Sequence, residues 1–148
     1  MGRLYTDNGN NAVEATETLA TYQAATTIRP ELQDIVVGCG VTPGDQATLF
    51  DLYRFTVDDG TASASTPEPL DPGDPAALGV FQITHTVEPN TIGAILLVVP
   101  LHQRATFRWV AAPGRGFKAA AVATAGWGFR SLTATGTAIH NCTLIWEE

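Results

Sequence analysis

The sequence has few cysteines and no long hydrophobic run. Cys39 and Cys142 are the only cysteines, too few for the disulfide framework of a small secreted domain, and they allow one disulfide without requiring it. The longest apolar run, residues 92–99, is far shorter than the ~20 residues of a membrane-spanning helix. We therefore expect a buried strand there and no membrane segment. The polar first residues lack the apolar stretch of a signal peptide, which predicts synthesis in a cytoplasm without export.

Basic residues are also scarce, since 8 Lys and Arg stand against 15 Asp and Glu, for a net charge of −7. The acidic residues concentrate in residues 1–90, with 13 acidic and 3 basic side chains, whereas residues 91–148 carry 2 and 5. The five cations of the second part are dispersed, so we expect no direct binding to nucleic acid. The asymmetry fits a molecule that docks one face onto a larger surface, although chance would also produce it.

Motifs for catalysis are missing as well. The sequence has no phosphate-binding loop with its lysine and no Gly-x-Ser-x-Gly nucleophile elbow, so we expect neither an enzyme nor a bound cofactor. The sharpest chemical possibility is a zinc site in which His140 and Cys142 join Cys39 or His85. A structural zinc site normally takes four ligands in tight pairs, and a single His-x-Cys pair is more typical of a strand in the core.

The residues that are present predict a β-protein. A chain of 148 residues, 45% of them hydrophobic, fits one domain, and its 14 glycines and 9 prolines leave little room for long helices. Apolar residues alternate along five segments, the pattern of strands with a buried face. In 47–57 apolar residues also fall on the second face, so both faces of this strand are candidates for burial. We expect an all-β fold, an antiparallel β-sandwich of jelly-roll or immunoglobulin-like type with seven or eight strands. The alternating segments are 32–41, 47–57, 80–87, 104–112 and 140–147.

Two segments fall outside this pattern. Residues 1–17 are polar and predict an extended N-terminal arm, with room for a short helix over 11–19, ahead of a single domain over 18–148. Residues 58–78 are acidic and rich in proline, which predicts a long irregular loop. Within the domain, Phe107, Trp109 and Trp146 are expected in the core.

The segment VPLHQRATFRWVAAPG, residues 99–114, is similar to one found in small structural proteins of tailed bacteriophages, usually encoded among the head genes. The ending over residues 136–148, a last strand followed by two acids, also resembles that group. This resemblance implies a head decoration, or cement, protein: a β-domain without enzymatic activity that binds the exterior of the assembled capsid, often as a trimer. The alternative is another virion component, such as a head fibre, a head–tail connector or a carbohydrate-binding tail protein.

On this hypothesis the partner is the major capsid protein and the protein resides on the virion. An arm can add a strand to the sheet edge of a neighbour, and arginine is enriched at protein interfaces. We therefore expect the contacts to come from the arm and from three arginines of the second part of the chain. The predicted contact residues are Leu4, Tyr5, Val13, Arg104, Arg108 and Arg130.

Overall fold

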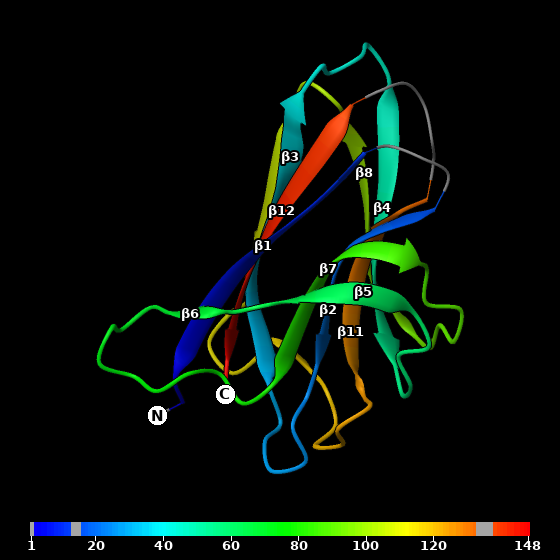
Figure 1. The fold of residues 1–148 in the computed structure, drawn as a ribbon. Helices are drawn as coiled ribbons and strands as arrows, with labels where there is room; N and C mark the ends of the chain where they lie inside the picture. Colours follow the sequence, from blue (N-terminus) through cyan, green and yellow to red (C-terminus); the bar gives the residue numbers. More distant parts are fainter. Residues whose placement is uncertain (1, 13–15, 133–137) are drawn as a thin grey trace.

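The computed structural model describes residues 2–12, 16–132 and 138–148, which form twelve strands and contain no helix (Figure 1). The strands build two antiparallel six-stranded sheets, so the predicted all-β, two-sheet fold is confirmed. Sheet A contains β1 (Leu4–Ala12), β3 (Glu31–Val41), β6 (Glu68–Pro69), β9 (Thr106–Val110), β10 (Phe117–Lys118) and β12 (Ile139–Glu147). Sheet B contains β2 (Glu17–Gln23), β4 (Ala47–Phe55), β5 (Thr61–Ser65), β7 (Val80–Val87), β8 (Ile95–His102) and β11 (Gly126–Ser131).

Sheet A brings the first and last strands of the described chain together. Its order is β10-β3-β12-β1-β6, with β9 also paired to β3, so β12 lies between β1 and β3. The register of β1 on β12 is unbroken, from Leu4 opposite Glu147 to Ala12 opposite Ile139. Sheet B has the order β5-β7-β2-β11-β4-β8, which leaves β5 and β8 at its edges.

The core is dominated by aromatic side chains that the two sheets direct toward each other. Trp146 of sheet A is fully buried and lies parallel to Phe81 of sheet B, with ring centroids 5.4 Å apart. Tyr22 stacks on Trp127 at 4.4 Å and also meets Trp146 at 5.0 Å. Such pairs add to the stability that burial of their area gives. Three aromatic residues were expected in the core. Trp146 is fully buried there, whereas Phe107 and Trp109 on β9 are half-buried and pack against the core cluster.

The predicted N-terminal arm is wrong for residues 4–12, because these residues form β1, an internal strand of sheet A. The helix expected over 11–19 is also wrong where the chain is described, since Glu17–Gln23 is strand β2. Composition misled the prediction because one inward position of β1 is Gly9, which contributes no apolar side chain. A Cβ there would lie 2.2 Å from the carbonyl oxygen of Leu19, so only glycine lets β1 approach β2 so closely.

Two further expectations need correction. The predicted irregular loop over 58–78 contains β5, paired with β7, and β6, paired with β1; neither strand has a large apolar side chain that would have marked it in the sequence. The run 92–99 was expected to be a buried strand. The structure instead has β8, which begins at Ile95 and lies at the edge of sheet B with Val98 exposed. Pro100 fits this position, because proline is tolerated on edge strands.

Replacing Thr84 with glycine is expected to stabilise the protein by about 1 kcal/mol. Thr84 is exposed in β7 and has φ of 54°, a conformation that is strained for a β-branched residue. Chemical denaturation of Thr84→Gly measures the gain. Thr106→Gly, at an exposed strand position where no positive φ occurs, is the control and should lose stability, as glycine usually does in a strand. Equal losses in both variants would contradict the prediction.

Candidate functional site

An open groove of about 550 Å³ lies on sheet A. Leu4 and Leu70 line it at the side of β1 and β6, Val110 and Pro113 line it at the side of β9, and Ile145 of β12 lies between them. Leu4, Leu70 and Val110 are 38%, 49% and 56% exposed. Large apolar side chains exposed together on one surface mark a binding site more often than isolated ones do.

The strand pleat explains why these side chains share a face. Along β12, His140, Cys142, Leu144 and Trp146 point into the core, so Ile145 and Glu147 point outward. Leu4 is the direct neighbour of Glu147 across β1 and β12, and Val110 is the neighbour of Asp34 across β9 and β3. Each apolar wall of the groove therefore has a carboxylate beside it.

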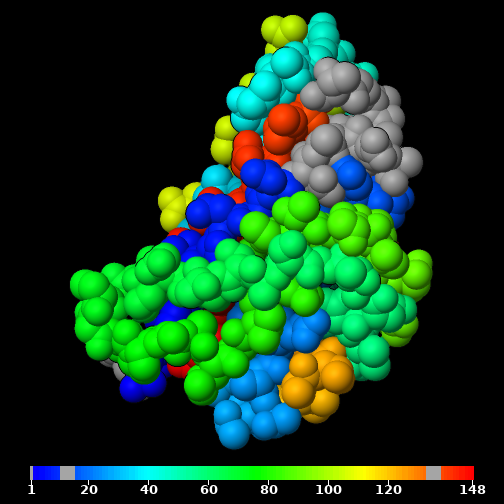
Figure 2. Space-filling model, viewed as in Figure 1, coloured from blue at the N-terminus to red at the C-terminus, as the bar shows by residue number. Residues whose placement is uncertain are grey.

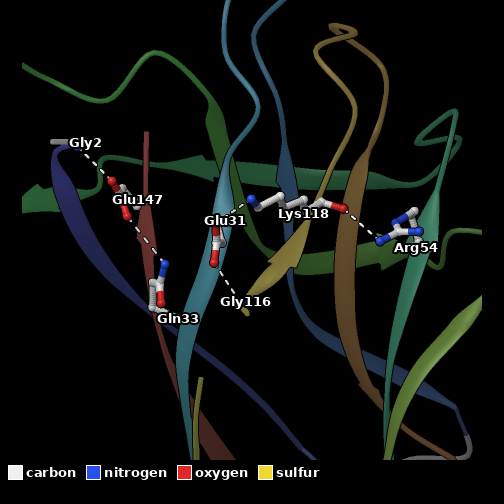
Figure 3. Close-up of polar contacts among 7 residues, drawn as sticks. All are labelled: Gly2, Glu31, Gln33, Arg54, Gly116, Lys118 and Glu147. Carbon is white, nitrogen blue, oxygen red and sulfur yellow. Dashed lines mark hydrogen bonds and ion pairs between the residues drawn. The ribbon is translucent and has the colours of Figure 1, made fainter. Parts of the chain in front are cut away.

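Hydrogen bonds hold the carboxylates of Glu147, which lines the groove, and of Glu31, its neighbour across β12 and β3 (Figure 3). Glu147 Oε1 accepts a 2.7 Å hydrogen bond from the Gly2 amide, and its Oε2 accepts one of 3.4 Å from Gln33 Nε2. Glu31 Oε1 accepts a 2.6 Å hydrogen bond from the Gly116 amide. Both acids thus fix the loops beside the groove.

A second set of contacts links this end of sheet A to sheet B. Lys118 Nζ lies 3.1 Å from Glu31 Oε2, and the Lys118 carbonyl accepts a 2.8 Å hydrogen bond from Arg54 of β4. Burial opposes the ionisation of Glu31, but the hydrogen bonds from Lys118 and Gly116 outweigh it and lower the pKa of this carboxyl. The position of Glu31 is therefore defined by its partners rather than left open for chemistry.

Glu148 has four donors around its carboxylate. Its Oε1 accepts hydrogen bonds from the Tyr22 hydroxyl at 2.5 Å, Trp146 Nε1 at 3.2 Å and the Gly79 amide at 3.2 Å. The Leu78 amide donates to Oε2 at 2.7 Å. Burial, followed by the hydrogen bond to Glu148, raises the pKa of Tyr22. These contacts attach the segment between β6 and β7 to the end of β12. Figure 2 shows residues of that segment, in green, spread across the surface.

The structure brings only two of the predicted contact residues to the groove. Leu4 lines it, and Arg108 pairs with the lining residue Asp34, its Nε lying 3.0 Å from Asp34 Oδ2. Arg104 is exposed elsewhere, 3.8 Å from Asp45. Val13 lies outside the described residues.

The other two predicted contact residues lack the exposure on which the prediction rested. Tyr5 is 1% exposed, and its hydroxyl donates to the Pro75 carbonyl at 3.0 Å. Arg130 is held against Asp51 at 2.8 Å and lies over the ring of Tyr53. Sequence reasoning missed Leu70, Val110 and Ile145. Strand alternation gave the outward direction of Val110 and Ile145, whereas Leu70 lay in the predicted loop, and nothing in the sequence indicated that the three meet.

The described cysteines and histidines that were considered for a zinc site show no arrangement that would bind a metal ion. Cys39 and Cys142 are both free thiols, and burial raises the pKa of Cys142 to about 12. His140 faces Cys39 across β12 and β3 and packs edge-on against Phe50, and burial lowers its pKa. In residues 2–12, 16–132 and 138–148, no three His, Cys, Asp or Glu side chains are grouped so that they could hold a metal ion.

Two further observations concern the class of protein. Within the part of the chain that the structure describes, no helix is long and apolar enough to cross a membrane. No family model matches the sequence, and neither a curated protein nor a solved structure matches it.

Proposed function

We propose that this chain is a bacteriophage capsid decoration protein that binds the exterior of the assembled head through the groove of sheet A. The observation that carries the proposal is the exposure of Leu4, Leu70 and Val110 around one open groove on sheet A. A structural partner with apolar side chains would cover this surface. The resemblance of residues 99–114 and 136–148 to head proteins of tailed phages suggests that the partner is the major capsid protein.

The chemistry of the groove defines the segment that it would take. Its walls favour an apolar segment of the capsid protein, and Glu147 at its end favours a neighbouring amide or basic group. The hydrogen bonds of Glu31 and Glu147 hold the surrounding loops, so little ordering entropy opposes binding. Because a head offers many equivalent sites, modest contacts in each would still stabilise the whole shell.

The proposal is tested on tailed phage particles released by the strain that encodes the chain. We expect the protein in many copies per head, and heads that lack it should lose resistance to heat. Val110→Glu places a carboxylate beside Asp34 in the groove and should reduce occupancy at least about tenfold. Val122→Glu is the matched control, because Val122 is 49% exposed and does not line the groove; its occupancy should equal that of the wild type.

Three results would overturn the proposal: particles without the protein, equal occupancy of both variants, or a copy number of a few per particle. The last result would instead favour a connector or fibre. Circular dichroism and thermal unfolding of the two variants keep a folding defect apart from a binding defect.

A further inference from the structure

Strand β8 leaves one edge of sheet B unpaired within the described residues. It hydrogen-bonds to β4 on one side and ends the sheet on the other. With 8 residues it is longer than β5, the opposite edge, which has 5. Ile95 and Val98 are 46% and 52% exposed. Proteins usually protect such an edge with lysine or other charges, and β8 has no Lys, Arg, Asp or Glu.

The backbone of β8 has groups available for pairing. Leu49 on β4 lies opposite Pro100, and the Leu49 carbonyl accepts its hydrogen bond from Leu132 on the other side, at 2.7 Å. Pro100 therefore faces away from β4, and the alternation of an antiparallel ladder turns Val98 the same way. Val98 thus presents both its N–H and its C=O to the free edge. Pro100 presents only a carbonyl and limits how far pairing can extend.

Charge determines which partner suits this edge. Residues 89–146 contain no Asp or Glu, although the chain as a whole carries −7. Two copies of an acidic protein repel each other at most contacts, but at β8 they would meet without a carboxylate on either strand. A strand without charges is also complementary to itself, because no like charges face each other when it pairs with its own copy.

The core beside this edge is incompletely covered. Leu97 of β8 packs against the core and is only half-buried, as are Phe107 and Trp109 of β9. Residues 103–105 are the whole connection between β8 and β9, so the end of the edge strand β8 lies close to the start of the edge strand β9. An added strand would cover Leu97 and extend the inner face of sheet B.

We propose that β8 pairs antiparallel with β8 of a second copy of this chain, around a two-fold axis at Val98. The Val98 residues of the two copies exchange N–H and C=O hydrogen bonds, and sheet B continues from one chain into the other. This contact is isologous and closes after two copies. It is a different assembly from the trimer that the family resemblance implies, and it is independent of the groove on sheet A.

The oligomeric state of the purified chain tests the pairing. Sedimentation velocity over a concentration series should show a dimer for the wild type. Val98→Lys should raise the dissociation constant at least about tenfold, because the new charges oppose each other across the axis. Val87→Lys is the matched control, since Val87 is 49% exposed at the end of β7, and it should dimerise as the wild type does.

A covalent test reports the register. In a Cys39→Ser background, Val98→Cys should form an intermolecular disulfide under mild oxidation by molecular oxygen, with loss of two thiol protons and reduction of the oxygen. Val87→Cys in the same background should not. A monomeric or trimeric wild type, a dimer that Val98→Lys leaves intact, or equal weakening by Val87→Lys would each overturn the pairing. Binding to phage heads is not measured in either experiment, so failure here leaves the proposed function to its own test.

Discussion

Asp51→Ala is expected to lower the free energy of unfolding by about 3–5 kcal/mol, because it leaves Arg130, whose side chain is only 15% exposed, without its counter-charge. Asp51 is 2% exposed, and its carboxylate accepts hydrogen bonds from Arg130 at 2.8 and 3.0 Å. Arg130 also lies 4.9 Å from the centroid of the Tyr53 ring. In the wild type the hydrogen bond to Asp51 raises the pKa of Arg130. In the variant that contribution is lost, but an arginine side chain is basic enough to keep its proton, so the guanidinium stays charged without a partner.

The Tyr53 ring over which Arg130 lies is itself tightly packed. Tyr53 covers Gly128, where a Cβ would lie 2.3 Å from the tyrosine ring. Asp34→Ala is the matched control, because Asp34 makes a similar pair with Arg108, whose side chain is 62% exposed. That arginine can be solvated when its partner is lost, so its variant should lose much less stability. Urea denaturation compares the two, and a small loss in Asp51→Ala would contradict the account.

Trp146→Ala is expected to cost about 3–5 kcal/mol, since it opens a cavity at the contact between the two sheets. The indole is fully buried and meets Tyr5, Tyr22, Phe81 and Trp127. Its Nε1 also donates to Glu148, so the substitution removes a hydrogen bond along with the packing.

Trp109→Ala provides the comparison for this substitution. Trp109 is half-buried on the edge strand β9 and stacks on Phe117 at 4.6 Å, and its loss should cost roughly 1–2 kcal/mol. Denaturant titrations give both values. If Trp146→Ala does not fold, Trp146→Phe should fold with an intermediate loss. Similar losses at positions 109 and 146 would show that the inter-sheet cluster is not the centre of stability.

Strand alternation was sufficient to predict the strands whose inward residues are large and apolar. The segment 80–87 coincides with β7, and 32–41 coincides with β3 except for one residue. It failed for β1, β5 and β6, which have few or no large apolar residues at alternating positions. Pairing with strands elsewhere in the sequence holds them in place. Composition carries no signal for such pairing, because backbone groups are the same in every residue.

The site illustrates the same limit. Arg130 follows the buried residue Phe129 in β11, so its side chain points outward from sheet B, as its position in the sequence suggests. The segment after β7 nevertheless covers that face: Pro89 is buried, and Glu88 accepts a 2.7 Å hydrogen bond from the Thr18 amide. Likewise, the groove on sheet A combines residues from positions 4, 70, 110 and 145, which only the topology brings together.

The position of β12 between β1 and β3 also constrains how the protein is made. β1 leaves the ribosome before the other described strands, yet its main partner spans Ile139–Glu147. The strands of sheet B, by contrast, are all complete by Ser131. Contacts so distant along a chain form slowly. During translation, β1 therefore stays without its main partner until β12 emerges and sheet A can be completed.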